Sequence, residues 1–379
     1  MSDFHRIPIA DLVVGERPKR ANPDVTEVWN LNLDQIESDS GRILARVMVS
    51  PKALGPSTYP FEAGTVLYSK LRPYLNKVVV ADRDGYATTE LVPLKCDAER
   101  VLPSYLAYFL RSSEFLSFAN AVVAGAKMPR MVMSEFWKFK VPLPPLPEQH
   151  RIAAILDKTD TLRTRRREVL AQLDRLTQSI FVDLFGDPAK NPRSWPTRTL
   201  KELGKVSTGG TPPSALDGMF GGDIPFVTPG DLESNQVVKR KVTEAGAQKA
   251  GTVRAGASLV CCIGATIGKM GLATVRSSFN QQLNAVEWFS DAMDDQYGLA
   301  ALRFFKPTII AWGASTTLPI LKKSSFEKVS IPVPPLELQQ EFARRSRSVT
   351  KLGERLRVAQ EVESTLFDAL QDRAFQGAL

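Results

Sequence analysis

The chain repeats itself along its length. The segment from Val141 to Gln149, Val-Pro-Leu-Pro-Pro-Leu-Pro-Glu-Gln, returns from Ile331 to Gln339 as Ile-Pro-Val-Pro-Pro-Leu-Glu-Leu-Gln, an offset of 190 residues. Between positions 124 and 149, 10 of 26 residues are identical at this offset, whereas unrelated sequences would share roughly two. A weaker match at an offset of 192 pairs Lys77 with Lys269. The chain is therefore two related halves, each a variable globular part followed by a more similar tail.

Length and composition agree with two globular parts. The 379 residues exceed the usual size of one domain, and 43% hydrophobic with 24% charged residues is ordinary globular composition. No apolar run approaches the roughly 20 residues that span a bilayer, so we expect no membrane partner. The first residues lack a basic stretch leading into an apolar segment, which favours a cytoplasmic location over secretion.

The charge balance favours a polyanionic partner. Forty-nine Lys and Arg against 41 Asp and Glu give a net charge of +8, and nucleic acid is the first candidate for such a surplus. The three cysteines, Cys96, Cys261 and Cys262, show no zinc or disulfide spacing, and the only histidines are His5 and His150. We therefore expect no metal and no cofactor.

Each tail predicts one long helix. The prolines cannot continue a helix, so the helices are expected to begin near Glu148 and near Glu337. Apolar residues then recur every seven positions, which is typical of a coiled coil. These residues are Ile155, Leu162, Val169 and Leu176 in the first tail and Leu352, Ala359 and Leu366 in the second. A helix from Glu148 to Phe185 would be about 57 Å long, the length of a spacer.

The globular parts mix β-like runs, at 64–68, 77–80 and 258–262, with an amphipathic helix expected over 105–120. The fold class is α+β, built twice. We place the first globular domain at 1–140, the first spacer helix at 141–186 and a Pro-, Asn- and Ser-rich linker at 187–196. The second domain spans 197–330 and the second spacer helix 331–379.

One candidate site is a loop that concentrates cations and an aromatic residue. Lys70, Arg72, Tyr74 and Lys77 lie within eight residues, in a segment kept irregular by Pro73. Such a loop can contact DNA phosphates and offer Arg or Tyr to a base edge, although a surface hairpin carries similar residues.

Matching positions in the two halves supply further candidates. Lys269 matches Lys77, and both lysines are candidates for a phosphate contact. The residues around Lys269 fail the phosphate-loop pattern, so a tight turn is favoured over a nucleotide site. Thr89 and Glu90 correspond in place to Gln281 and Gln282. Gln can pair with adenine and Glu with cytosine, but capping and turn roles explain these residues equally well.

The densest basic run lies on the first predicted spacer helix, at Arg163, Arg165, Arg166 and Arg167. It is either a solvated helix face or a contact for the DNA between two half-sites or for an acidic partner.

The whole arrangement resembles the specificity subunit of type I restriction-modification systems, in which two variable domains are each followed by a Pro-rich segment and a long helix. The segments 68–74, 208–212 and 222–232 resemble phrases common in that family, and on this resemblance Thr211 is a further DNA-binding candidate. The sequence Glu337-Leu338-Gln339 departs from the Pro-Glu-Gln of the first tail.

The resemblance implies a division of labour. Each globular domain would be a target recognition domain that reads one half of a bipartite double-stranded DNA target, and the helices would pair as an antiparallel coiled coil that fixes the gap. Methylation subunits, typically two, would dock on the helices and carry the methyl-transfer chemistry, and restriction subunits would add cleavage. The chain itself would be non-catalytic.

Three other interpretations remain. The same scaffold could serve a methylation-only system, or the chain could be a self-contained DNA-modifying enzyme, although neither a methyltransferase nor an NTPase signature is present. A coiled-coil scaffold that never touches DNA is opposed only mildly by the net charge of +8.

Overall fold

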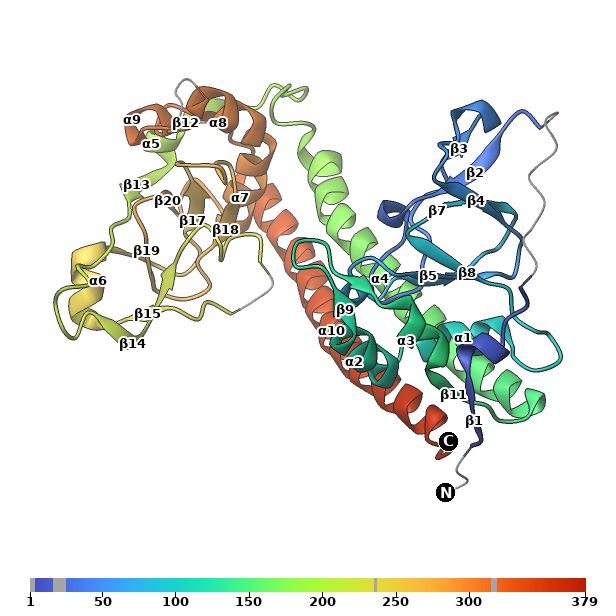
Figure 1. The fold of residues 1–379 in the computed structure, drawn as a ribbon. Helices are drawn as coiled ribbons and strands as arrows, with labels where there is room; N and C mark the ends of the chain where they lie inside the picture. The colour runs from blue at the N-terminus through green and yellow to red at the C-terminus, as the bar shows by residue number, and fades with distance from the viewer. Residues whose placement is uncertain (1–3, 16–24, 235–236, 315–318) are drawn as a thin grey trace. The chain divides into compact units, whose positions relative to one another are not determined.

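The structure, a computed structural model, describes residues 4–15, 25–234, 237–314 and 319–379. It divides into two compact units. Unit 1 comprises Met1–Glu168 together with Leu356–Leu379, and unit 2 comprises Val169–Arg355. Each unit combines small β-sheets with short helices and with parts of two long helices (Figure 1), which confirms the α+β class and the tandem arrangement.

Unit 1 contains the first eleven strands. They are β1 (Arg6–Pro8), β2 (Val28–Leu31), β3 (Met48–Val49), β4 (Thr58–Phe61), β5 (Val66–Ser69), β6 (Val78–Val80), β7 (Gly85–Thr88), β8 (Leu91–Leu94), β9 (Val123–Ala124), β10 (Arg130–Met131) and β11 (Lys140–Pro142). Its helices are α1 (Pro103–Leu110), α2 (Ser113–Ala121), α3 (Met133–Lys138) and the start of α4 (Leu146–Phe185), with short 3-10 turns η1 (Ile9–Asp11), η2 (Leu33–Gln35), η3 (Pro51–Ala53) and η4 (Pro73–Leu75).

Unit 2 contains the remaining elements. Its strands are β12 (Thr197–Thr199), β13 (Gly204–Thr208), β14 (Phe220–Val227), β15 (Lys241–Val242), β16 (Thr252–Val253), β17 (Ser258–Cys261), β18 (Met270–Leu272), β19 (Ser277–Phe279), β20 (Leu283–Trp288) and β21 (Ser330–Pro332). Its helices are α5 (Leu200–Leu203), α6 (Glu244–Ala250), α7 (Asp295–Phe304), α8 (Lys306–Gly313), α9 (Lys323–Phe326) and the start of α10 (Leu336–Phe375).

The sheets of the two units have the same plan. In unit 1 the sheet orders are β3-β2-β7-β4 and β6-β5-β8, and in unit 2 they are β15-β14-β19-β16 and β13-β20-β17-β18. In each unit one strand pair of the first sheet is parallel, β2 with β7 and β14 with β19, while the other pairs are antiparallel. A two-stranded ladder joins the start of each unit to the strand before its long helix, β1 to β11 and β12 to β21. The repeat seen in the sequence is thus a repeat of topology.

One predicted helix is two helices. The segment expected to be helical over 105–120 forms α1 and α2, which are separated at Arg111 and Ser112. The Ser112 hydroxyl accepts a hydrogen bond from the Phe115 backbone N–H at 3.3 Å and caps α2. This local capping competes with continuation of α1 and turns the chain.

A buried glutamine anchors the start of each long helix. The Gln149 side chain, fully buried, accepts a hydrogen bond from the Leu102 backbone N–H at 2.8 Å. Its amide N–H groups donate to the carbonyls of Arg100 and Pro144, both at 2.9 Å. The equally buried Gln339 accepts from the Asp294 N–H at 2.9 Å and donates to the carbonyls of Ala292 at 3.1 Å and Pro334 at 2.8 Å. The glutamine that ends both Pro-rich segments therefore locks the helix to its domain.

The heptad line does not mark the buried face of α4. Leu162, Val169 and Leu176 keep 40–48% of their surface exposed, whereas Leu156 and Phe181 are buried. A repeat of seven identifies a stripe along the helix, but not which stripe meets a neighbour. The buried stripe is the one that meets aromatic residues of a unit, as Phe181 meets Tyr297 and Phe342, because this contact removes apolar surface from water.

Aromatic residues at the end of each long helix complete the core of a unit. Phe375 of α10 packs on Tyr105 and Phe109 of α1, with ring centroids 5.4 and 5.0 Å apart. In unit 2, Phe185 of α4 packs on Tyr297 at 4.8 Å. Within unit 1 the two long helices run antiparallel, since Arg151 donates to the Leu379 carbonyl at 3.1 Å and Arg166 pairs with Glu363 at 2.8 Å. Within unit 2 Phe181 and Phe185, at the end of α4, pack on Phe342 near the start of α10.

Candidate nucleic-acid interface

The candidate loop of unit 1 connects β5 to β6. It spans residues 70–77 and contains the 3-10 turn η4. Arg72 has φ 50° and Asn76 has φ 47°, so both adopt the left-handed conformation. That conformation costs a residue with a Cβ roughly 1–2 kcal/mol, and such strained residues cluster at functional sites.

The loop of unit 2, residues 262–269, joins β17 to β18 in the same way. Gly264 and Gly268 hold the two left-handed positions that Arg72 and Asn76 hold in unit 1. The connection runs from strand to strand, whereas a nucleotide-binding phosphate loop leads from a strand into a helix. The near match to that pattern is therefore a tight turn.

The same backbone hydrogen bonds hold both loops. The equivalent pairs are Ser69 N to Lys77 O (3.0 Å) and Cys261 N to Lys269 O (2.8 Å), Lys70 N to Glu90 O (3.0 Å) and Cys262 N to Gln282 O (2.8 Å), and Arg72 N to Pro129 O (2.7 Å) and Gly264 N to Pro319 O (2.9 Å). Each loop is thus held by the residue directly before β8 or β20, Glu90 or Gln282, and by a proline further along the chain, Pro129 or Pro319. The framework is common to both units, while the side chains it carries differ.

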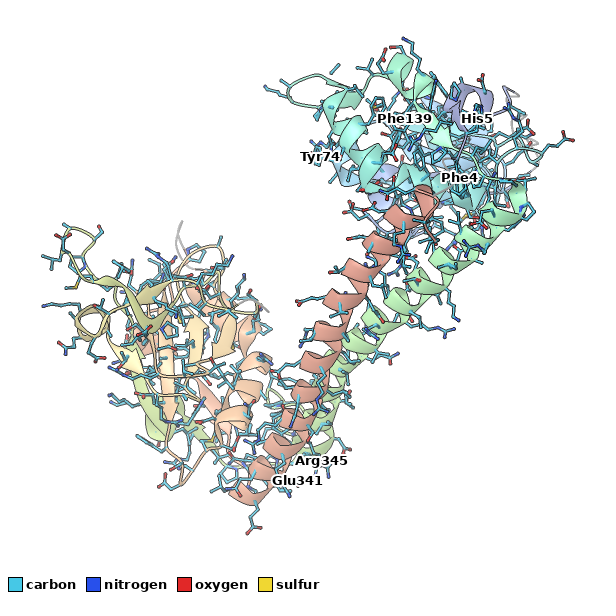
Figure 2. The ribbon with its side chains drawn as sticks, turned by 90° about the horizontal axis from the view of Figure 1, so that it is seen from below. Phe4, His5, Tyr74, Phe139, Glu341 and Arg345 are labelled. Carbon is cyan, nitrogen blue, oxygen red and sulfur yellow. The ribbon has the colours of Figure 1, made fainter. Side chains whose placement is uncertain are left out.

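The side chains of the first loop have different degrees of freedom. Tyr74 is 53% exposed, and Figure 2 shows it at the surface of unit 1. Arg72 is exposed and Lys70 half-buried. The Lys77 ammonium donates a hydrogen bond to the Leu33 carbonyl at 2.6 Å, so it is partly engaged within the unit. Its counterpart Lys269 is half-buried, directly before β18.

Glu90 has a cationic partner that the sequence patterns missed. The Arg130 guanidinium makes a forked contact with its carboxylate, at 2.9–3.2 Å. Hydrogen bonding to Glu90 raises the pKa of Arg130 above its ordinary value. Thr89, the residue before Glu90, is exposed, and its backbone N–H donates a hydrogen bond to the Ser57 carbonyl at 3.1 Å. The signal that could have identified Arg130 is its position next to Pro129, at the start of the strongest repeat.

The polar residues of unit 2 are also brought together. The exposed Thr211 hydroxyl donates to the side-chain carbonyl of the exposed Gln281. Gln282 accepts a hydrogen bond from the Asn280 amide at 3.1 Å, and its backbone N–H donates back to Asn280 at 3.2 Å. Gln281 is thus exposed and Gln282 half-buried, and the side-chain carbonyl of each accepts one hydrogen bond.

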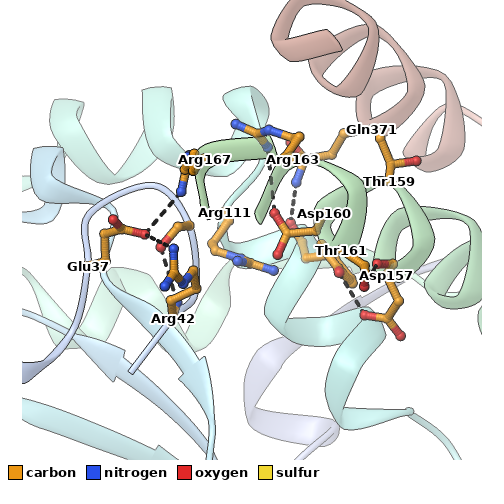
Figure 3. A network of polar contacts seen from close by, with 12 residues as sticks. Glu37, Arg42, Arg111, Asp157, Thr159, Asp160, Thr161, Arg163, Arg167 and Gln371 are labelled. Carbon is orange, nitrogen blue, oxygen red and sulfur yellow. Dashed lines mark hydrogen bonds and ion pairs between the residues drawn. The ribbon is translucent and has the colours of Figure 1, made fainter. Parts of the chain in front are cut away.

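The basic run on α4 forms intramolecular contacts. Arg167 binds Glu37 at 3.2 Å, and Glu37 also lies 3.8 Å from Arg42 (Figure 3). Arg163 lies 3.8 Å from Asp160 and stacks over the Phe367 ring at 4.5 Å. In the same unit, Arg166 pairs with Glu363 of α10 at 2.8 Å. Three of the four arginines therefore hold the helices and the domain of unit 1 together.

A second set of contacts ties the end of the first loop to the helices. The Asn76 amide donates to the Arg111 carbonyl at 3.1 Å, at the end of α1. Gln371 of α10 donates to the Tyr108 carbonyl at 2.8 Å, on the same helix. The Arg111 guanidinium stacks on Tyr108 at 4.6 Å, and burial lowers its pKa (Figure 3 shows its place among the neighbouring charges). The loop is positioned by packing that also includes α10.

Burial raises the pKa of Cys96 and of Cys262 to about 12, which keeps both thiols protonated at neutral pH. Over residues 4–15, 25–234, 237–314 and 319–379, no cluster of His, Cys, Asp and Glu is suited to a metal ion. Among those same residues no helix has the length and apolarity to cross a bilayer.

The fold defines a tandem two-domain protein with a duplicated hairpin loop and a pair of long helices. The sequence profile of the family described as "Type I restriction modification DNA specificity domain" matches residues 56–173 and 192–358, and the chain belongs to this family.

Relatives that match the chain are specificity subunits of type I restriction enzymes. The chain is 27% identical to the type I restriction enzyme EcoDI specificity subunit of Escherichia coli, over 43% of this chain and 37% of that protein. It is 24% identical to a putative MjaX specificity subunit of Methanocaldococcus jannaschii, over 70% of this chain and 65% of that protein. The chain thus spans less than two thirds of each. A HindI specificity subunit of Haemophilus influenzae is 21% identical, over 78% and 82%.

Solved structures share the fold. The S subunit of a type I restriction-modification system from M. genitalium has a TM-score of 0.63 at 15% identity, covering 98% of this chain and 96% of that one. A chain from a structure described for the complex assembly and conformational transition of the type I R-M system has a TM-score of 0.61 at 19% identity, covering 100% of this chain and 98% of that one.

Proposed function

We propose that the chain is the DNA-binding specificity subunit of a type I restriction-modification complex. Residues 1–140 and 197–330 are its two target recognition domains, 187–196 the linker, and 141–186 and 331–379 the spacer helices. Each domain reads one half of a bipartite double-stranded target. The chain supplies the address, and partner subunits supply the chemistry.

One observation carries this proposal: the same loop framework is built twice and filled with different side chains. Arg72 and Tyr74 of the first loop correspond to Gly264 and Thr266 of the second, and Glu90 corresponds to Gln282. A conserved framework with varied side chains suits two readers of different sequences, because positioning and base readout are separate tasks. The target is therefore split and asymmetric. Its contacts are proposed at Lys70, Arg72, Tyr74, Lys77, Thr89 and Glu90 in unit 1 and at Thr211, Lys269, Gln281 and Gln282 in unit 2.

The long helices are the proposed docking surface for methylation subunits, of which two would match the two-fold repeat, with restriction subunits joining them. Leu162, Leu176 and Leu366 remain 43–52% exposed on helices rich in charge. Exposed apolar residues in such a setting are typical of a protein contact. We place the protein in the cytoplasm, where its DNA and these partners meet.

Mapping methylated adenines in host DNA tests this function. Deleting the gene should remove methylation from one split motif, two short half-sites around a fixed gap, and leave other motifs methylated. Restoring the gene should restore the motif. If the methylation pattern stayed unchanged and the purified chain did not bind DNA, the chain would be a protein scaffold and would not recognise DNA.

The two matched lysines provide a test at residue level. Lys77→Ala and Lys269→Ala should each weaken binding to all duplex DNA and lower the slope of log affinity against log salt by about one, as one lost phosphate contact does. Lys77 can serve although it already donates to Leu33, because an ammonium group has three donors. Binding is measured by fluorescence anisotropy across a salt titration. Lys190→Ala in the linker removes the same charge as a control, and a slope equal to that control would remove the lysine from the interface.

A further inference from the structure

The outer edge of a sheet in unit 2 carries three consecutive cations. Lys239 and Arg240 directly precede β15, and Lys241 is its first residue; β15 is the edge strand of the sheet β15-β14-β19-β16. All three side chains are exposed. They belong to neither the repeat nor the basic run on α4, and they lie outside the duplicated loop.

The strand register brings these cations to the end of the sheet that carries the candidate site. β15 runs antiparallel to β14 with Lys241 opposite Pro225, and the Phe226 N–H donates to the Arg240 carbonyl at 2.9 Å. β14 runs parallel to β19, with Val227 opposite Phe279, the residue before Asn280, Gln281 and Gln282. Two strand spacings, about 10 Å, therefore separate the backbone at Arg240 and Lys241 from β19, and the polar residues directly follow that strand.

The charges of the three cations are not balanced by neighbouring carboxylates in the described residues. In the part of the chain that the structure describes, none of them forms an ion pair. Three other cations of unit 2 do: Arg254 with Asp295 at 2.7 Å, Arg276 with Glu244 at 2.7 Å and Lys306 with Glu233 at 2.9 Å. A run of unpaired cations on one edge strand concentrates positive potential there.

Aromatic packing holds the central cation of the three. The Arg240 guanidinium lies over the rings of Phe220 and Phe226, 5.5 and 5.6 Å from their centroids. The three cations line an open groove together with Phe220, Gly221 and Gly222.

The corresponding edge of unit 1 is different. There β3 occupies the place of β15, and Arg46, just before it, stacks on Trp29 at 5.9 Å and is paired with Asp82. Its charge is therefore already neutralised within the unit. The spare cations are a property of the second domain and not of the common framework.

We propose that Lys239, Arg240 and Lys241 form a phosphate-binding edge that holds duplex DNA beside the half-site contacted by unit 2. This inference rests on the proposed function and extends its interface to a second element. Its ligand is the sugar-phosphate backbone, so it contributes affinity and register without reading bases. Cations on an edge strand can instead serve only to prevent edge-to-edge aggregation.

The double variant Lys239→Gln with Lys241→Gln tests the edge without disturbing the aromatic packing under Arg240. We expect the salt slope of the chain to fall by about two, and its affinity for DNA at about 0.1 M salt to fall about sixtyfold, from a slope of about 0.9 per phosphate. The probes are a labelled duplex carrying the mapped motif and a scrambled duplex, and both should lose the same factor. Lys205→Gln with Lys323→Gln removes two ion-paired cations of the same unit as the matched control.

The outcomes separate the alternatives. A slope equal to that of the matched control would overturn the proposal. Unchanged DNA binding with new self-association on gel filtration would assign the cations to edge protection. A loss confined to the motif duplex would make them base contacts and contradict the phosphate assignment. If the unmodified chain bound neither duplex, the proposed function itself would fail, and this inference with it.

Discussion

Removing one heptad from each long helix is expected to abolish methylation of the original motif and to create a motif with the same half-sites and a shorter gap. Seven residues of helix span about 10.5 Å, which corresponds to roughly three base pairs of DNA. The deleted segments are residues 169–175 of α4 and 351–357 of α10, near the middle of each helix. The Arg166–Glu363 pair of unit 1 and the Phe181–Phe342 pair of unit 2 both lie outside the deleted segments.

The experiment depends on keeping the helix faces in phase. A heptad is close to two full turns, so each face shifts by only about 20°. Deleting five residues from each helix instead rotates the rest of that helix by roughly 140° and should leave no methylated split motif at all. Adenine methylation in strains that carry each variant is the measurement. A heptad deletion that changed the half-site bases and preserved the gap would show that the helices do not set the spacing.

Truncating the aromatic residue at the end of either long helix is expected to cost about 3–5 kcal/mol in the free energy of unfolding, as for other buried Phe-to-Ala changes. Phe375 and Phe185 are 4% and 2% exposed and lie 190 residues apart, at equivalent places in the repeat. Phe375→Ala opens a cavity beside Tyr105 in unit 1, and Phe185→Ala opens one beside Tyr297 in unit 2.

Urea unfolding measures the size of the loss, and hydrogen exchange shows where it falls. Phe375→Ala should reduce amide protection in unit 1, and Phe185→Ala in unit 2. Val362→Ala and Val182→Ala are the matched controls on the same helices, because both valines are exposed and surface changes stay within about 0.5 kcal/mol. If the phenylalanine variants matched these controls, the helix ends would not contribute to the cores.

Local patterns predicted the elements well. The helices expected near Glu148 and Glu337 begin at Leu146 and Leu336, and the runs expected at 64–68, 77–80 and 258–262 become β5, β6 and β17. These predictions succeed because prolines, apolar periodicity and β-branched runs act over a few residues. The break at Ser112 was missed because a capping hydroxyl there competes with an otherwise continuous apolar pattern.

The candidate site was only partly accessible to such reasoning. The positions of Lys77 and Lys269 follow from the repeat, and the two loops do share one backbone framework. The pairing of Glu90 with Arg130 joins residues 40 apart, and the alignment of the edge cations with Gln281 depends on strand register. Which of the proposed residues contact DNA stays a prediction.

The sequence by itself determined that this protein is a tandem repeat, that each half ends in a long helix, and that Lys77 and Lys269 occupy matching positions in the two halves. Identity at a fixed offset and short-range propensity are sufficient for those features. Only the tertiary structure decided which face of each helix is buried, since that depends on aromatic residues brought in from the other repeat, Phe375 against Tyr105 and Phe185 against Tyr297. It also decided which cations are neutralised, because an ion pair requires a partner that only folding brings within a few ångströms.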